Sequence, residues 1–183
     1  ATNTRLSMAS WSNLFPQSVA GINGVYFHED LTPSGFFTAR DVRQQKRVFD
    51  LDKSALLVIN DKLRLVDTAI TPMEFKNVRQ GAQSYPILIE DGRVKLTRDT
   101  EKLGRRSWIG TDRKGWVWMG VLPNGQVSLF TLAQRLMEIG IDWEMVVNLD
   151  GGPSTGLFFR KDDDVTTYET IGGVPNVLIV EKK

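Results

Sequence analysis

The residues best suited to chemistry lie in one short stretch, Val146–Gly156, which reads VVNLDGGPSTG. A hydrophobic segment with the pattern of a strand delivers Asn148 and Asp150, and because side chains alternate along a strand, both point to the same face. Gly151 and Gly152 permit a close approach of the backbone, and their N–H groups favour binding of an anion. The stretch therefore predicts a carboxylate and an amide beside an anion-binding loop. A tight turn, in which both side chains cap local backbone, fits the same pattern.

A second set of polar groups accompanies an earlier apolar segment, Gly21–Phe27 (GINGVYF), which contains Asn23 and is followed by His28, Glu29 and Asp30. A buried asparagine without hydrogen-bond partners costs about 1–3 kcal/mol. Asn23 therefore either holds a bulge or takes part in a site. His28 fits both a surface or packed histidine and a catalytic one.

Two adjacent arginines, Arg105 and Arg106, stand at the entry to a predicted strand. The planar guanidinium group suits bidentate recognition of a phosphate or a carboxylate. A solvated strand end would have the same sequence, so the pair alone leaves both interpretations open.

The composition excludes several kinds of site. The chain has 183 residues, no cysteine, one histidine and a formal net charge of +1. Thiolate nucleophiles, zinc fingers and iron–sulfur clusters are thereby excluded. The near-neutral charge argues against a polybasic nucleic-acid binder, and no run reaches the roughly 18 apolar residues of a membrane span. We expect no nucleic-acid partner, no membrane span and one domain over residues 1–183.

The elements that must hold these residues are mostly short strands, so we expect an α+β domain with a largely antiparallel or mixed sheet and two or three helices. The main helix is predicted over 129–139, with Ser128 as N-cap and Gly140 after its end. A helix is also expected within 4–16, a short one opening at Thr71-Pro72, and a loop over 28–44. Turns are expected at Asp91-Gly92 and Asn124-Gly125. The predicted strands are 18–27, 46–51, 55–60, 62–67, 82–89, 93–97, 106–111, 115–121, 144–149, 156–160, 165–170 and 176–181.

Taken in order, several motifs resemble those of the phosphodiester glycosidase family. The similarity runs over roughly residues 10–182, and its most specific part is Asn148–Thr155 (NLDGGPST). The other matching segments are Asn23–Phe27, Pro33–Gly35, Gln83–Leu88, Arg106–Gly110, Leu129–Leu136 and Val174–Asn176.

The chain departs from the family pattern at a few positions. Val25 and Tyr85 stand where the family has glycines, and the arginine expected before Pro175 is absent. Family members usually place strands before the first helix. Barely ten residues precede it here, which leaves open whether N-terminal strands are missing.

The resemblance implies a hydrolase that cleaves the bond between the anomeric carbon of a sugar and a phosphodiester oxygen. Arg106, with the Gly151 and Gly152 amides, would bind the phosphate, and Asp150 would act as nucleophile or as base for water. Glu29 or Asp30 would be the second carboxylate, with His28 as proton shuttle. Retention or inversion at the anomeric carbon stays open. The residues expected to bind substrate hydroxyls or to orient Asp150 are Asn23, Asn148, Ser154, Thr155 and Asn176.

The same resemblance guides the expected partners and location. We expect a carbohydrate phosphodiester as substrate, no cofactor and no required metal. Oxygen ligands for Ca²⁺ or Mg²⁺ are nevertheless available from Asn148, Asp150 and the acidic residues 29–30. Bacterial members of the family are often described as exopolysaccharide-related, which implies a secreted or periplasmic protein. The sequence does not indicate the oligomeric state.

Two other function classes remain open from the sequence. One is a non-catalytic carbohydrate-binding module, in which Trp108, Trp116 and Trp118 would offer stacking faces to sugars. The other is an envelope or assembly domain that would use an exposed apolar patch or an edge strand.

Overall fold

The structure is a computed structural model, and it describes residues 4–39, 42–45, 54–59, 62–72, 75–162 and 164–182. Its described strands form three sheets, in which every pairing is antiparallel. The antiparallel α+β prediction is thus confirmed, but the chain builds three sheets where we expected one. Two α-helices, α1 (Met8–Leu14) and α2 (Leu129–Glu138), lie within the described residues.

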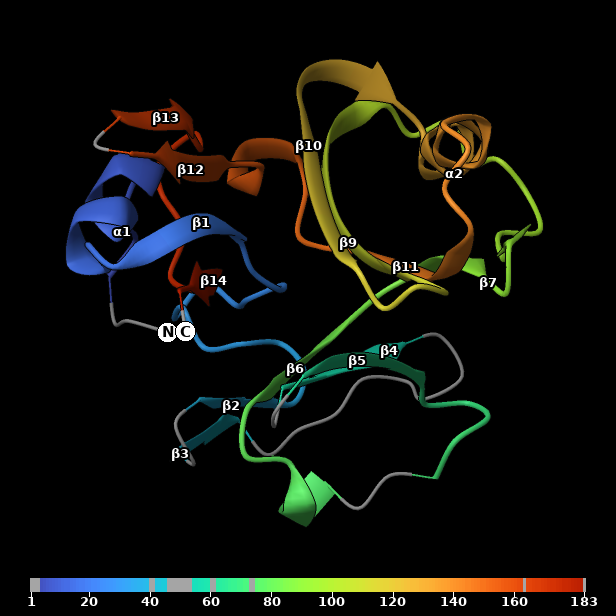
Figure 1. Cartoon of the computed structure of the whole chain (residues 1–183), viewed down its shortest axis with the longest axis horizontal. Coiled ribbons are helices and arrows are strands. Elements are labelled where there is room, and N and C mark those ends of the chain that lie inside the picture. Colours follow the sequence, from blue (N-terminus) through green and yellow to red (C-terminus); the bar gives the residue numbers. More distant parts are fainter. Residues whose placement is uncertain are drawn as a thin grey trace.

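Each sheet draws on a different part of the chain (Figure 1). The terminal sheet has the order β13-β12-β1-β14 and combines both ends of the chain: β1 (Ser18–Asn23), β12 (Leu157–Lys161), β13 (Asp164–Tyr168) and β14 (Val177–Glu181). The curved sheet has the order β10-β9-β11-β7-β8: β7 (Ile87–Glu90), β8 (Arg93–Val94), β9 (Gly104–Asp112), β10 (Val117–Val127) and β11 (Trp143–Asn148). The third sheet has the order β3-β2-β6-β4-β5: β2 (Phe37–Ala39), β3 (Val42–Gln45), β4 (Ala55–Ile59), β5 (Leu63–Asp67) and β6 (Gly81–Ser84).

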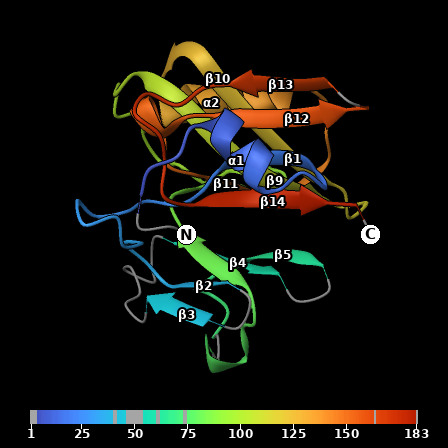
Figure 2. The same cartoon turned by 90° about the vertical axis from the view of Figure 1, so that its left-hand side faces the viewer.

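The main core draws on all three sheets, with Ile22 from the terminal sheet, Leu57 from the third sheet, and Ile109 and Val147 from the curved sheet. Figure 2 shows the third sheet below the other two. Because each sheet contributes one apolar face to the same cluster, none of them buries its residues alone. The core therefore fixes the three sheets against one another.

Helix α2 covers the opposite face of the curved sheet (Figure 1). Its Leu132 and Leu136 pack in one cluster with Trp108 and Trp143 of the sheet. The Ser128 side chain accepts a hydrogen bond from the Thr131 amide at 3.1 Å, as an N-cap residue should. The prediction of this helix from its apolar spacing and its cap is confirmed.

Four local predictions are wrong, and each error has a physical cause. The strand expected over 18–27 ends at Asn23, because the main chain of Gly24 bonds outside the ladder, to Asn176 and Asp150. The loop expected over 28–44 contains β2 and β3, two strands too short to show an alternating pattern. The turn expected at Asn124-Gly125 lies within β10, where the register shifts between Leu122 and Val127.

The fourth error concerns 82–89, which is two strands instead of one. β6 pairs with β4 of the third sheet, whereas β7 pairs with β11 of the curved sheet. The chain crosses between the sheets at Tyr85-Pro86, which is a cis peptide. The short helix expected from Thr71-Pro72 corresponds to a 3₁₀ turn over Phe75–Asn77, and the strand expected over 46–51 lies outside the described residues.

Two buried asparagines tie the terminal sheet to the loop that follows β11. Asn23 donates from Nδ2 to the Asp150 carbonyl at 2.6 Å and accepts at Oδ1 from the Gly156 amide at 3.1 Å. Asn176 accepts from the Val25 amide at 2.8 Å and donates to the Val25 carbonyl at 3.2 Å. Between them lies Gly24, whose amide bonds to the Asn176 carbonyl and whose carbonyl accepts from the Asp150 amide.

We expect Gly24→Ala to lower the free energy of unfolding by about 1–3 kcal/mol, the usual cost of overpacking. A Cβ at this position would lie 1.9 Å from Oδ1 of Asn176, so the asparagine would have to leave its bonds to Val25. The matched control is Gly104→Ala, where the nearest atom to a Cβ is 3.7 Å away. Denaturant unfolding of both variants checks the prediction, and equal stability of the two would contradict it.

Candidate active site

Strand register places Asn148 and Arg106 on one face of the curved sheet, and Asp150 follows directly after β11. Asn148 lies opposite Trp108, and the Leu149 amide donates to the Ser107 carbonyl at 2.9 Å. Beyond Leu149 the chain leaves this pairing, because the Asp150 amide donates to the Gly24 carbonyl at 3.2 Å. A Cβ built on Gly151 would lie 3.9 Å from Nη1 of Arg106, which confirms that the loop and the arginine meet.

Asn148 is 1% exposed, and its amide nitrogen has two partners. Nδ2 donates to the Tyr85 carbonyl at 3.1 Å and to the Tyr26 hydroxyl at 2.7 Å. Because a carbonyl can only accept, the bond to Tyr85 fixes the orientation of the amide. Oδ1 is then buried without a hydrogen-bond partner in the structure. An unsatisfied buried acceptor costs about 1–3 kcal/mol, so this oxygen is available to a ligand hydroxyl.

Tyr26 links Asn148 to the two charged groups of the site. Burial, followed by the Asp150 charge and by Tyr85, raises the pKa of Tyr26 well above its ordinary value, while the Asn148 hydrogen bond and the Arg106 charge act in the opposite direction. The phenol therefore stays protonated at every ordinary pH. Its ring lies against that of Tyr85, with centroids 4.8 Å apart.

Asp150 is partly buried, and this burial raises the pKa of its carboxyl. The Ser154 side chain, the Gly151 amide and the Arg5 charge lower the pKa, but they do not cancel the effect of burial. A carboxylate that has lost part of its water is a stronger base and nucleophile than an exposed one. The amide of Gly151 acts on this carboxyl, so it is not simply free for an external anion as the anion-binding loop predicted.

Arg106 is held in place by carbonyl oxygens on one side of its guanidinium group. Nε donates to the Val127 carbonyl at 2.9 Å, and Nη2 donates to the Lys102 carbonyl. Burial lowers the pKa of Arg106, although an arginine stays charged at neutral pH. These two bonds leave Nη1 beside Gly151. Arg105 has a structural role instead, since its Nη2 donates to the Thr155 and Glu169 carbonyls, both at 2.8 Å.

The loop after Asp150 has its own internal structure. A 3₁₀ turn spans Gly152–Ser154, and Gly152 takes a φ of 59°, which favours glycine. The Ser154 and Thr155 amides bond to the Gly151 and Gly152 carbonyls, both at 3.2 Å. Thr155 is fully buried, and its hydroxyl has no hydrogen-bond partner in the structure.

The remaining expected site residues have contacts other than the Asp150 carboxyl. His28 and Glu29 are exposed in a turn closed by the His28 amide and the Thr32 carbonyl. Across the described ranges, no hydrogen bond or ion pair joins them to Asp150. Asn23 and Asn176 direct their side chains to the protein backbone and thereby position the loop of Asp150.

Sequence reasoning missed three residues of this site: Tyr26, Tyr85 and Arg5. Tyr26 bonds to Asn148, the Tyr85 carbonyl accepts from the same amide, and the Arg5 charge acts on Asp150. Arg5 also lies over the Phe27 ring, 5.2 Å from its centroid. Tyr26 lies within Asn23–Phe27, one of the segments that resemble the family motifs, and this position could have indicated its role in the site. Nothing local indicates Arg5, because its position depends on pairing between Leu6 and Val174.

Two further features are absent from the part of the chain that the structure describes. It contains no group of three or more His, Asp or Glu side chains placed to hold a metal ion. None of its helices combines the length and apolar character that crossing a membrane requires.

The sequence model of the phosphodiester glycosidase family matches residues 16–181. The chain belongs to this family. A search of curated proteins found no match. Among solved structures, the fold is similar to the catalytic domain of zebrafish N-acetylglucosamine-1-phosphodiester α-N-acetylglucosaminidase, auto-inhibited by its pro-peptide, with a TM-score of 0.72 at 14% identity. That match covers 99% of this chain and 68% of the zebrafish chain.

A hypothetical protein from Synechocystis is also similar, with a TM-score of 0.62 at 13% identity. The match covers 98% of this chain and 54% of the Synechocystis chain. The chain therefore spans about half to two thirds of the length of these two neighbours. At such low identity the likeness establishes the shared fold, and the activity has to be argued from the site.

The buried carboxyl of Asp150 predicts a stability effect that is independent of activity. Its pKa is raised in the folded state, so ionisation destabilises the fold as pH rises from the ordinary aspartate pKa of about 3.9 to the raised value. We expect Asp150→Asn to unfold at a higher temperature than wild type at pH 7. This advantage should shrink as pH falls back through that window.

Thermal unfolding at several pH values measures the effect. The matched control is Asp142→Asn, whose carboxylate is exposed and pairs with Arg113 at 3.4 Å, and which should change stability by about 0.5 kcal/mol or less. A stability advantage of Asp150→Asn that does not vary with pH would show that the Asp150 carboxyl is not the cause.

Proposed function

We propose that this member of the phosphodiester glycosidase family hydrolyses the bond between a sugar's anomeric carbon and the oxygen of a phosphodiester. The observation that carries the proposal is that a partly buried carboxyl, Asp150, and a charged arginine, Arg106, both act on the phenol of Tyr26. Membership of the family supports the same reaction. The sugar and the group on the other side of the phosphate are not part of the proposal.

The reaction needs a base or nucleophile at the anomeric carbon. In one route the Asp150 carboxylate attacks that carbon, the carbon–oxygen bond breaks, and its electron pair leaves on the phosphate; water then cleaves the glycosyl ester. In the other route Asp150 takes a proton from the water that attacks. Both routes require Asp150 to be ionised and yield a free sugar and a phosphate monoester.

The departing phosphate needs neutralisation more than it needs a proton. A phosphate monoester is stable as an anion, so protonation contributes less here than with an ordinary glycoside. We assign the phosphate to Nη1 of Arg106, because Nε and Nη2 are already bonded to carbonyls that hold the group still. This mechanism requires no second carboxylate, and among the described residues neither Glu29 nor His28 has a hydrogen bond or ion pair to Asp150.

The sugar hydroxyls need acceptors that are fixed before the substrate arrives. Oδ1 of Asn148 is such an acceptor, because it is buried and lacks a partner while Nδ2 holds the amide in position. We assign it to a sugar hydroxyl. The Thr155 hydroxyl is a second unpartnered buried group close to this loop. Ser154 acts on Asp150 instead and helps to keep it ionised.

The two family departures affect the site differently. Val25 is a core residue whose amide and carbonyl both bond to Asn176, so its side chain leaves the site backbone intact. Tyr85 adds a ring beside Tyr26 while its carbonyl holds Asn148. We propose that Tyr85 narrows the sugar site without removing a reacting group. A secreted or periplasmic location remains a proposal that rests on the family.

Asp150→Asn should lower kcat/KM by about 10²–10⁴-fold, the range expected for loss of a catalytic base. Suitable substrates are a panel of hexose and N-acetylhexosamine 1-phosphodiesters with an alkyl group, and ³¹P NMR follows conversion of the diester to a monoester. The control Asp142→Asn should keep wild-type activity. In H₂¹⁸O the label should enter the sugar and not the phosphate.

Three results would oppose this function. Label in the phosphate would show cleavage of the phosphorus–oxygen bond, and full activity of Asp150→Asn would remove its assigned role. Saturable sugar-phosphate binding without turnover would instead favour a non-catalytic carbohydrate-binding domain.

The pH profile gives a separate test of the Asp150 environment. Since the raised pKa must be exceeded for the carboxylate to act, kcat/KM should fall on the acid side at a pH above the ordinary aspartate value of about 3.9. Ser154 lowers the pKa of Asp150, so Ser154→Ala should move this acidic limb to higher pH. A limb that stays unchanged in Ser154→Ala would assign it to another group.

A further inference from the structure

A pocket of about 410 Å³ lies at the turn between β9 and β10, far from Asp150 along the sheet. It is lined by Asp112, Lys114, Trp116, Val117 and Trp118. Asp112 ends β9 and Arg106 lies near its start, so six residues, or about 20 Å of extended strand, separate the pocket from the candidate active site. Helix α2 packs on Trp108 between them, so the pocket is a distinct feature.

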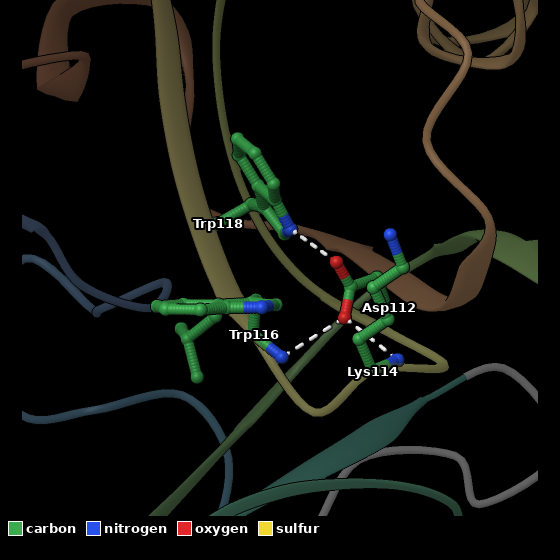
Figure 3. A pocket seen from close by; sticks show the side chains of 5 residues that line it. Asp112, Lys114, Trp116 and Trp118 are labelled. Carbon is green, nitrogen blue, oxygen red and sulfur yellow. Dashed lines mark hydrogen bonds between the residues drawn. The ribbon is translucent and has the colours of Figure 1, made fainter.

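Two tryptophans form the apolar wall of the pocket. Trp116 is 67% exposed and Trp118 is 40% exposed. Both lie on the same side of Asp112, as Figure 3 shows. Leaving most of an indole in water forgoes the stabilisation that burial would give, and exposed tryptophans in a pocket are typical of a surface that binds a ligand.

The carboxylate of Asp112 holds this wall rigid. Oδ1 accepts from the amides of Lys114 at 3.0 Å and Trp116 at 2.9 Å, and Oδ2 accepts from Nε1 of Trp118 at 3.0 Å (Figure 3). Trp118 also meets the Trp143 ring edge-on, with centroids 6.2 Å apart. Because both the turn and one indole are fixed before any ligand arrives, little conformational entropy is lost on binding.

The polar groups of the pocket restrict what it can hold. In the described part of the chain Lys114 has no ion pair, whereas its neighbour Arg113 is engaged by Asp91 and Asp142. The Lys114 ammonium therefore offers its donors beside the aromatic wall. A sugar ring matches this arrangement, since it presents C–H groups to a flat indole and hydroxyls at its rim to a charged donor.

A second copy of the chain fits the same surface less well. β10 is an edge strand of the curved sheet, so pairing between copies is the natural rival. A two-fold contact here would set the Lys114 side chains of the two copies, each in the turn just before β10, against each other, and lysines at a sheet edge oppose such pairing. The concave shape also suits a small ring better than a flat strand.

We propose that this pocket is a second carbohydrate-binding site, in which the exposed face of Trp116 stacks on a sugar ring and Lys114 binds its hydroxyls. The site takes no part in the proposed hydrolysis. It would retain an oligosaccharide on the protein surface, away from the reacting bond. Its existence does not depend on the activity proposed for Asp150.

The test uses the full chain labelled with ¹⁵N and titrated separately with maltotriose, cellotriose and tri-N-acetylchitotriose. The chain has five tryptophans, so their indole signals form a small set that a Trp116→Ala spectrum helps to assign. We expect the Trp116 and Trp118 signals to shift saturably with at least one trisaccharide, with a Kd near the millimolar range. Trp116→Ala should weaken that binding by about tenfold or more, and Trp116→Phe should retain part of it.

The controls separate this proposal from folding and from the candidate active site. Ile70→Ala removes an apolar side chain of the same 67% exposure outside the pocket and should bind as wild type. Asp150→Asn should also bind as wild type, and Trp116→Ala should hydrolyse a small sugar phosphodiester normally if the wild type does.

Two results would overturn the proposal. One is no saturable shift with any of the three sugars up to about 10 mM, or shifts that persist in Trp116→Ala. The other is a wild-type dimer that becomes monomeric in Trp116→Ala, measured by sedimentation, which would make this face an interface between copies.

Discussion

The candidate site depends on one buried side chain that belongs to neither the loop nor the curved sheet. Asn23, at the end of β1, donates to the Asp150 carbonyl at 2.6 Å and accepts from the Gly156 amide at 3.1 Å. It thereby satisfies main-chain groups at both ends of the loop that follows β11. A glycine-rich loop has little rigidity of its own, so its shape has to come from such contacts. The terminal sheet is thus a support for a site whose functional groups lie on the curved sheet.

This support explains how Asp150 can be kept in an unfavourable environment. Partial burial raises the pKa of its carboxyl, which means that the ionised group destabilises the folded state at neutral pH. The destabilisation is tolerated because the adjacent backbone is bonded to Gly24 and Asn23, and the strand before it is buried in the common core. Arg5 and Ser154 limit the shift without removing it. The same balance of burial and local donors is a common way to make a carboxylate reactive near neutral pH.

Local patterns predicted the elements whose sequences contain their own boundaries. Helix α2 has an N-cap serine, an apolar face and a following glycine, and the hairpin of β12 and β13 turns within four residues. The strand pattern also placed Asn148 on the face that carries Arg106. The predictions that were wrong or incomplete concern segments whose structure is decided by residues far away in the sequence. Residues 82–89 form two strands because their first half pairs with β4 of the third sheet and their second half with β11 of the curved sheet. The contribution of Tyr26 to the site likewise requires Asn148, which is 122 residues away.

A buried apolar segment of the curved sheet separates its two polar ends. At one end Arg106 and Asn148 lie at the mouth of the loop; at the other, Asp112 organises the tryptophan pocket. Between them Trp108 packs over Gly120, where a Cβ would lie 2.4 Å from the indole, and Trp143 packs edge-on against Trp108. A side chain at position 120 would push these rings toward α2, so the glycine is required by packing. Because this buried segment is tightly packed and apolar, it holds the two ends of the curved sheet in fixed orientations. Each end therefore forms its site from its own side chains. The strand pair β9–β10 can therefore carry a region suited to catalysis at one end and a region suited to binding an oligosaccharide at the other.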